Sequence, residues 1–165
     1  MKILLAAVNA KYIHTNLAVC SLQAYAGEHA KGADVEIAEY TINQQKDDIL
    51  MDIYRRRADI LCFSCYIWNL DYIEELVRDM AKLRPDMPIW LGGPEVSYDA
   101  PDVLARLPEV TGVMKGEGEE TFAGLCRFYQ GCEGDGLRSL RGIAFRDTDG
   151  TVRDNPWRPV MDLND

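Results

Sequence analysis

Short apolar runs alternate with segments of helical periodicity through most of this chain, and that alternation leaves few folds open. The runs are nearly continuous, which is typical of strands covered on both faces of a sheet. In the segments between them, apolar side chains recur every three or four residues, as on an amphipathic helix. The predicted strands are residues 2–8, 35–42, 60–67, 88–91 and 110–115, and the predicted helices are residues 17–31, 44–57, 70–84, 101–107 and 119–129.

Five strand–helix pairs predict an α/β protein with a five-stranded parallel sheet and helices on both faces, in three layers. The expected strand order is 2-1-3-4-5, the flavodoxin-like variant of the Rossmann-like folds. After Gly136 the pattern changes, because residues 142–146 and 151–153 flank Asp149–Gly150, which favours a β-hairpin. Residues 155–165 contain two prolines and show no period, as in a linker. We therefore expect a domain over residues 1–136, followed by a hairpin and linker over residues 137–165.

Length and charge exclude several classes of protein. The 165 residues are enough for one domain, since domains usually contain about 100–200 residues. A net charge of −9 argues against binding to nucleic acid or to an anionic membrane surface, which both require clustered Lys and Arg. The apolar run at residues 3–8 is too short to span a bilayer, and no signal-peptide cleavage site follows it. We expect a cytoplasmic protein.

The cysteines do not form a disulfide scaffold or a metal-binding motif. The five cysteines are odd in number, so they cannot all pair, and they are thinly spread over 165 residues. This pattern fits a reducing compartment. Cys62 and Cys65 are spaced as in a Cys-x-x-Cys pair, but no second pair could complete a zinc site. Because both lie in a predicted strand, a spacing of three points them to opposite faces of the sheet. We interpret them as core residues.

The unusual residues of the chain follow predicted strands, and so fall on one edge of the sheet. In such sheets a ligand binds outside the carboxyl ends of the strands. His14 and Asn16 follow the first strand, Ser64 and Tyr66 the third, Gly92–Gly93–Pro94–Glu95 the fourth, and Gly116–Glu117–Gly118 the fifth. This coincidence predicts a binding site at that edge.

Each of these turns also has a purely structural explanation. Gly92–Gly93 could form a tight strand-to-helix turn, or could let a bulky ligand approach the backbone. Gly116-x-Gly118 lies among Glu117, Glu119 and Glu120, which suit the start of a helix better than a phosphate site. His14 could be a surface residue or a metal ligand. The chain contains no Gly-x-Gly-x-x-Gly turn, no phosphate-binding loop and no Gly-x-Ser-x-Gly elbow.

Taken together, these turns resemble the cobalamin-binding domain at the N-terminus of many radical S-adenosylmethionine (SAM) enzymes. The resemblance covers the whole chain and rests on the turns at residues 91–95 and 116–119, Thr121–Phe122, and the hairpin with its proline-containing tail. Cobalamin domains of this fold carry Asp-x-His-x-x-Gly, Ser-x-Leu and Gly-Gly motifs. His14, Ser64, Gly92 and Gly93 match these motifs, whereas Tyr12, Leu17 and Tyr66 replace the aspartate, the first glycine and the leucine.

The resemblance implies what each matching residue does. The nucleotide tail of cobalamin would enter a channel beside Gly92–Gly93, where a side chain would block it, and Ser64 would contact its buried base. His14 is the candidate cobalt ligand, although Tyr12 leaves it without the aspartate that orients such a histidine. The other candidate cofactor-binding residues are Asn16, Tyr66, Pro94, Glu95, Gly116, Glu117 and Gly118.

The resemblance also implies a partner that lies outside this chain. Radical SAM chemistry needs Cys-x-x-x-Cys-x-x-Cys, but Cys62 and Cys65 supply only two of these positions, with Ala58 at the first. We therefore expect the [4Fe-4S] cluster and SAM in a separate radical SAM domain of the same polypeptide, of the methyltransferase or magnesium-protoporphyrin monomethyl ester cyclase class. The present chain would be inactive alone. Two alternatives are a degenerate docking domain that binds no cofactor, and a flavodoxin-like nucleotide or flavin binder.

Overall fold

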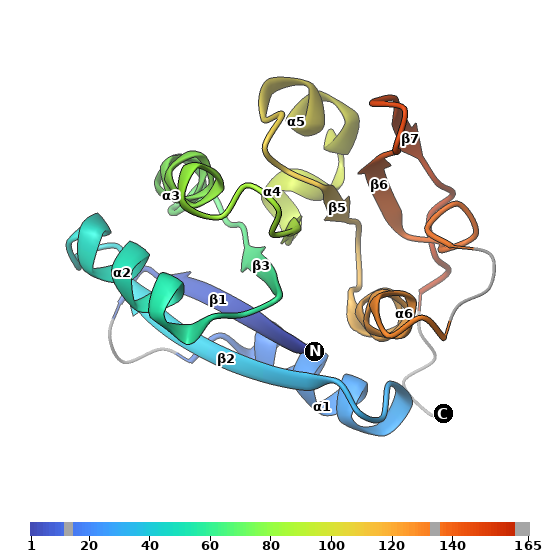
Figure 1. Cartoon of the computed structure of the whole chain (residues 1–165), viewed down its shortest axis with the longest axis horizontal. Coiled ribbons are helices and arrows are strands. Elements are labelled where there is room, and N and C mark those ends of the chain that lie inside the picture. Colours follow the sequence, from blue (N-terminus) through green and yellow to red (C-terminus); the bar gives the residue numbers. More distant parts are fainter. Residues whose placement is uncertain (12–14, 133–135, 161–165) are drawn as a thin grey trace.

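The computed structural model describes residues 1–11, 15–132 and 136–160, which form a mixed sheet with helices on both faces (Figure 1). The strands are β1 (Lys2–Asn9), β2 (Asp34–Thr41), β3 (Ile60–Ser64), β4 (Ile89–Gly92), β5 (Gly112–Met114), β6 (Ile143–Arg146) and β7 (Val152–Asp154). The helices are α1 (Leu17–His29), α2 (Lys46–Arg56), α3 (Leu70–Leu83), α4 (Pro94–Ser97), α5 (Ala100–Arg106) and α6 (Glu119–Tyr129).

The sheet of the described chain has seven strands in the order β2-β1-β3-β4-β5-β6-β7, so the prediction of five strands was wrong. Strands β1 to β5 are parallel, and the predicted order 2-1-3-4-5 describes only this part. Strands β6 and β7 form the predicted hairpin, but β6 also pairs antiparallel with β5 and extends the sheet. Residues 143–145 are buried and find partners on both faces, which favours pairing with β5.

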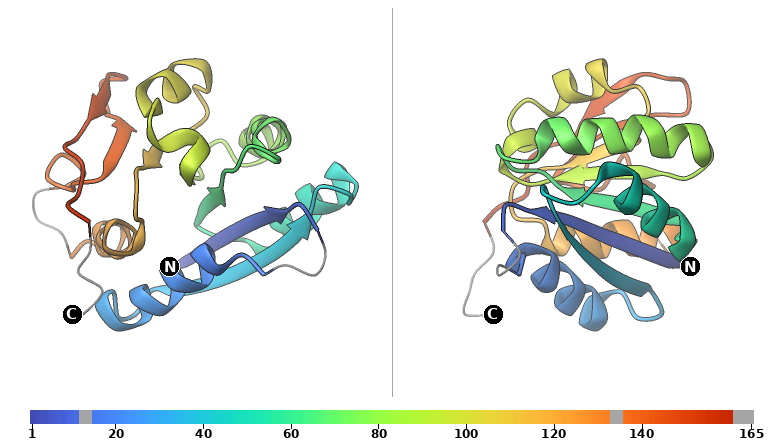
Figure 2. Two further views of the ribbon diagram at one scale, coloured as in Figure 1. Left: turned by 180° about the vertical axis from the view of Figure 1, so that it is seen from behind. Right: turned by 90° about the vertical axis from the view of Figure 1, so that its left-hand side faces the viewer.

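Two apolar clusters lie on opposite faces of the sheet. Helices α2, α3, α4 and α5 cover one face, and α1 and α6 cover the other, as the views of Figure 2 also show. Trp90 is fully buried on the α1–α6 face, where its indole fills the space beside Gly112. A Cβ atom at Gly112 would lie 2.3 Å from Trp90 Cζ3, so this glycine serves core packing. Cys62 and Cys65 belong to different clusters, which confirms that they are core residues on opposite faces.

Local sequence signals set several helix ends. Asn16 caps α1, because its Oδ1 accepts from the N–H groups of Ala18 and Val19. A proline stands in the first turn of α5, as expected, and Pro94 begins the additional short helix α4 directly after Gly93. In the described part of the chain, none of the helices has the length and apolar character needed to cross a membrane.

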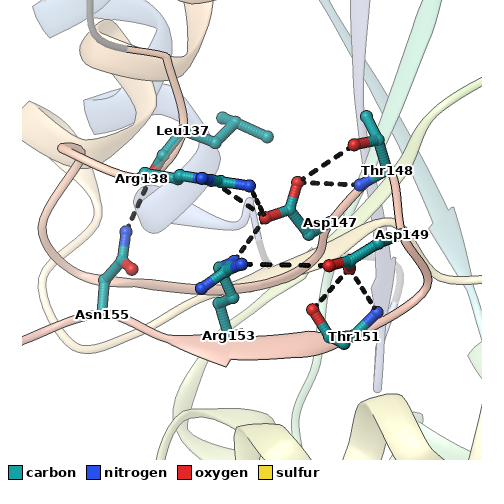
Figure 3. A network of polar contacts seen from close by, with 8 residues as sticks. All are labelled: Leu137, Arg138, Asp147, Thr148, Asp149, Thr151, Arg153 and Asn155. Carbon is teal, nitrogen blue, oxygen red and sulfur yellow. Dashed lines mark hydrogen bonds and ion pairs between the residues drawn. The ribbon is translucent and has the colours of Figure 1, made fainter.

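The turn of the β6–β7 hairpin is held by polar side chains (Figure 3). Asp149 Oδ1 accepts from the N–H and the hydroxyl of Thr151, and Gly150 takes a positive φ of 82°. Asp147 accepts from Arg138, Arg153 and the N–H of Thr148. The hairpin is thereby tied to the preceding segment as well as to β5.

Candidate functional site

A cleft of about 430 Å³ opens at the carboxyl ends of the parallel strands, on the face that α1 and α6 cover. Most of its lining is apolar, and the lining includes the two acidic residues Glu117 and Glu119. The lining residues come from β1, β3, β4, β5, the first half of α1, α4, the first residue of α6 and the loops after β3, α4 and β5. They are Leu5, Ala18, Val19, Leu22, Cys62, Phe63, Ser64, Tyr66, Gly92, Gly93, Pro94, Ser97, Tyr98, Met114, Gly116, Glu117, Gly118 and Glu119.

Small residues at one register position explain why the cleft is hollow. Ala7 pairs with Ser64, Ser64 with Gly92, and Gly92 with Met114, so these four residues form one row across β1, β3, β4 and β5. Two residues earlier on the same face of the sheet, Cys62 pairs with Trp90, and the Trp90 indole fills the core beneath. The change from Leu5 to Ala7 on β1 and from Trp90 to Gly92 on β4 ends the packed core and leaves space above the strand ends.

The two consecutive glycines, Gly92 and Gly93, have different structural roles. The heavy atoms nearest to a Cβ atom at Gly92 would belong to Met114, at 3.6 Å or more, so the missing side chain leaves cleft space. Gly93 has a φ of 111°, and a Cβ atom there would lie 2.4 Å from the carbonyl oxygen of Cys65. Gly93 therefore permits the turn between β4 and α4 and its close approach to β3. The tight strand-to-helix turn considered for this pair is thus made by Gly93, whereas Gly92 leaves space at the cleft.

Ser64 presents a hydroxyl to the cleft from the end of β3. Its Oγ accepts from Asn16 Nδ2 at 2.9 Å, while Asn16 Oδ1 caps α1. Because Ser64 Oγ is the acceptor in that bond, its own hydrogen stays available for an acceptor in the cleft. The side-chain partner of Ser64 is thus Asn16.

The loop after β3 is organised by Asn69, a buried residue that does not line the cleft. Its Nδ2 donates to the carbonyl groups of Val8, at 2.8 Å, and Ser64, at 3.1 Å, and its Oδ1 accepts from the N–H of Tyr66 at 2.8 Å. These bonds join the ends of β1 and β3. They place Tyr66 at the cleft, where its ring stacks on Trp68 with centroids 4.5 Å apart.

Hydrogen bonds also connect the β4 and β5 sides of the cleft. Ser97 Oγ donates to the carbonyl oxygen of Gly93 at 2.7 Å and accepts from the N–H of Gly116 at 3.1 Å. On the opposite rim, Ser21 Oγ donates to Glu119 at 2.8 Å and links α1 to α6. Gly118 lets these helices approach, because a Cβ atom there would lie 3.0 Å from Leu22 Cδ2.

The structure brings most of the predicted site residues together. Eight of them line the cleft: Ser64, Tyr66, Gly92, Gly93, Pro94, Gly116, Glu117 and Gly118. Asn16 supports the cleft through Ser64, whereas Glu95 is not among the lining residues. His14 and Tyr12 lie outside the described residues. Sequence reasoning missed ten lining residues: Leu5, Ala18, Val19, Leu22, Cys62, Phe63, Ser97, Tyr98, Met114 and Glu119. The available signal was the pair of apolar residues Leu17 and Ala18 at the start of the predicted helix.

The cysteines beneath the cleft are suited to packing and not to metal binding. Burial raises the pKa of Cys65 to about 12 and raises that of Cys62 well above its ordinary value. Both thiols therefore stay protonated at neutral pH, and a thiol must lose its proton to bind a metal. Among the described residues, no group of three or more His, Cys, Asp and Glu side chains is placed to hold a metal ion.

Comparison with known proteins identifies the family. The sequence model of the B12-binding domain matches residues 3–126, so the chain belongs to the B12-binding domain family. A curated relative, 2-(S-pantetheinyl)-carbapenam-3-carboxylate methyltransferase of Streptantibioticus cattleyicolor, is 38% identical over 64 residues, which are 39% of this chain and 9% of that protein.

Solved structures share the fold. The cobalamin-dependent SAM radical enzyme OxsB, with aqua-cobalamin and SAM bound, superposes with a TM-score of 0.79 over 96% of this chain and 22% of its own, at 19% identity. The radical SAM methyltransferase TsrM from Kitasatospora setae gives a TM-score of 0.73 over 94% of this chain and 30% of its own, at 17% identity. The present chain thus spans about a tenth of the curated relative and less than a third of these enzymes.

The described residues fit the cofactor of this family. A large, mostly uncharged ligand needs an apolar cleft with a few polar groups, which the lining supplies. The space left beside Gly92 and the available hydrogen of Ser64 would suit an inserted heterocycle that carries a hydrogen-bond acceptor. The chain is a B12-binding domain whose fold matches the cobalamin-binding part of cobalamin-dependent radical SAM enzymes.

Proposed function

We propose that the cleft at the carboxyl edge of the sheet holds cobalamin, with Gly92 and Ser64 at the position of its nucleotide tail. The observation that carries this proposal is the row of small residues Ala7, Ser64 and Gly92. This row leaves space above the ends of the strands, whereas earlier rows of the same strands are covered by packed side chains. Ser64 would donate a hydrogen bond to the base of the tail, and Asn16 would hold Ser64 in position. Tyr66 would contact cobalamin from the lining of the cleft, with its ring held in place by stacking on Trp68.

Cobalamin supplies a cobalt centre whose bond to carbon can be made and broken, as methyl transfer requires. The residues of this chain bind and orient the cofactor and exclude water from one side of it. His14 is the candidate cobalt ligand. Replacing His14 with alanine should then change the visible spectrum of bound cobalamin, and an unchanged spectrum would leave His14 out of the coordination sphere.

The whole protein would be a radical SAM enzyme of the methyltransferase or cyclase class. The named relatives are methyltransferases and a radical enzyme, and each is much longer than this chain. The [4Fe-4S] cluster and SAM would belong to a radical SAM domain of the same polypeptide, with residues 1–136 as the cofactor-binding unit and residues 137–165 leading toward that domain. Five free cysteines favour a reducing compartment, and so the cytoplasm.

A titration with hydroxocobalamin tests the cofactor assignment. The chain should shift the visible absorption of hydroxocobalamin, whereas flavin mononucleotide at the same concentration should remain unbound. A Gly92→Leu variant should bind hydroxocobalamin at least about tenfold more weakly, because the leucine fills the space reserved for the tail. No spectral shift at high micromolar hydroxocobalamin would contradict the proposal, and flavin binding would favour the flavodoxin-like alternative.

Gly27→Leu is the matched control. Gly27 lies in α1, it is exposed, and a Cβ atom there would meet nothing within 4 Å. This variant should bind hydroxocobalamin like the unaltered chain. Circular dichroism should show that both leucine variants are folded, so that a loss of affinity at position 92 reports on the cleft.

A further inference from the structure

Residues 154–158 begin at the last residue of β7 and contact residues of the cleft wall; we call them the strap. The N–H of Asn155 donates to Ile143 at 3.0 Å, and the carbonyl oxygen of Pro156 accepts from the N–H of Gly142 at 2.9 Å. Farther along, Arg158 donates to Glu120 Oε2 at 2.6 Å, at the start of α6. The strap is therefore attached to β6 and α6 by backbone and side-chain bonds, although its sequence suggests a linker.

Lys115 is the central attachment of the strap. It follows β5 directly, and its side chain is only 2% exposed. Its Nζ donates to the Asp154 carboxylate and to the carbonyl oxygen of Asn155, at 2.7 Å, and lies 5.1 Å from the centroid of the Trp157 ring. A buried ammonium group is tolerated only with such partners. All three partners belong to the strap.

Trp157 connects the strap to the lining of the cleft. A Cβ atom at Gly116 would lie 3.2 Å from Trp157 Cζ3, so the indole packs directly on the Gly116 backbone. The ring also contacts Tyr98, with centroids 5.6 Å apart. Gly116 and Tyr98 both line the cleft, whereas Trp157 does not. Trp157 thus contacts two lining residues of the cleft without lining it itself.

We propose that the strap sets the shape of the cobalamin cleft, with Lys115 and Trp157 as its positioning residues. Lys115 holds residues 154 and 155 at the end of β5. Trp157 is thereby kept in contact with Gly116 and Tyr98 and fixes their positions. This inference rests on the proposed cobalamin site and adds a means of regulation to it. Any force or contact that pulls on the chain after residue 158 would loosen the wall and weaken cofactor binding.

Coupling between two sites is reciprocal, which gives two independent measurements. Lys115→Met and Trp157→Ala should each lower the affinity of the full 165-residue chain for hydroxocobalamin by about fivefold or more. Trp157→Phe should retain most of the affinity, because a phenyl ring can still cover Gly116. Conversely, hydroxocobalamin should slow hydrogen–deuterium exchange in the strap of the unaltered chain, and both weakening variants should accelerate it.

A double variant tests whether the two residues act through one element. If they do, Lys115→Met with Trp157→Ala should bind no more weakly than the weaker of the two single variants. Tyr54→Ala is the control, since Tyr54 is 47% exposed on α2, close to the 45% of Trp157, and should leave affinity unchanged. Asp154 is half exposed, so it can be hydrated when Lys115 is replaced, and circular dichroism should confirm folding.

The outcomes separate this inference from the cofactor assignment. If the unaltered chain binds hydroxocobalamin and the variants release the strap without losing affinity, the strap has no role in the cleft and the inference is overturned. If the variants do not accelerate exchange in the strap, Lys115 and Trp157 do not hold it. If the unaltered chain fails to bind hydroxocobalamin, the cobalamin site itself is wrong, and the inference falls with it.

Discussion

Gly92 and Gly93 show how adjacent identical residues acquire separate roles from their backbone positions. Gly92 ends β4 in extended conformation and leaves space above the sheet, whereas Gly93 occupies a conformation that a side chain would strain. Replacing them should therefore affect different properties of the protein. The variants at Gly92 test ligand binding, and a variant at Gly93 tests the fold.

Gly93→Ala should destabilise the protein by about 1–3 kcal/mol, because the methyl group would meet the Cys65 carbonyl oxygen and the backbone conformation is unfavourable for alanine. Gly92→Ala should change stability little, since its methyl group would make only ordinary contacts with Met114. Urea unfolding of the two variants measures the difference. Equal stabilities would contradict the distinction between the two glycines.

Asn69→Ala should lower stability by about 2–4 kcal/mol, because it leaves the carbonyl groups of Val8 and Ser64 and the N–H of Tyr66 without their buried partner. Asn43, which is exposed after β2, provides the control, and Asn43→Ala should be nearly neutral. Thermal unfolding compares the two variants. A small effect at Asn69 would mean that water replaces its bonds and that the loop after β3 is not organised by this residue.

At the scale of elements, the hairpin formed by β6 and β7 was predicted, but its place in the sheet was not. Asp149–Gly150 identifies a hairpin turn locally, and Gly150 adopts the positive φ that such a turn uses. Pairing of β6 with β5 depends on the contacts of Ile143, Ala144 and Phe145 with both faces of the sheet. Three consecutive apolar residues cannot by themselves distinguish an isolated hairpin from a strand that joins the sheet.

The stability of the protein should depend on pH through the ionisation of Asp147 in the hairpin. Hydrogen bonds from Arg153, Thr148 and Arg138 lower the pKa of Asp147 to about 2, from an ordinary value of 3.8. The folded state therefore favours the ionised carboxylate, and this stabilisation is complete above about pH 5 and is lost as the pH falls toward 2. Asp147→Asn should be less stable than the unaltered chain at pH 6, and the difference should shrink between pH 4 and pH 2.

Urea unfolding across this pH range measures the effect, with the exposed Asp34→Asn variant as the control. A stability difference at Asp147 that stays constant from pH 6 to pH 2.5 would mean that the carboxylate charge does not stabilise the hairpin. Asp149 lies in the same turn and its pKa is also lowered, by Thr151, so a variant at this position should behave in the same direction.

At the scale of the molecule, the parallel part of the fold and the location of the cleft could be predicted, because strand ends in such a sheet meet at one edge. Ser64, Gly92 and Gly116 were found through their positions after strands. Ala18 and Leu22 were missed, because they reach the cleft only through the packing of α1 on the sheet. Tyr98 and the strap were missed for the same reason, since their contacts join segments far apart in the sequence.

The burial of three cysteines predicts how the folded molecule reacts with thiol reagents. Burial raises the pKa of Cys65 and of Cys126 to about 12, so on the order of 10⁻⁴ of each thiol is ionised at pH 8. In the native protein a disulfide reagent should rapidly modify Cys132, which is exposed, and more slowly Cys20. The other three should react only after unfolding. Rapid native modification of all five would contradict the packing of the core.

The packing of Trp90 against Gly112 also has a consequence for the fluorescence of the protein. The chain has three tryptophans, and they occupy three different surroundings: Trp90 lies in the core, Trp68 stacks at the cleft, and Trp157 sits on the strap. Emission from Trp90 should be blue-shifted and should change only with global unfolding. Single-tryptophan variants would thus give separate fluorescence signals for the core, the cleft and the strap, without any attached dye.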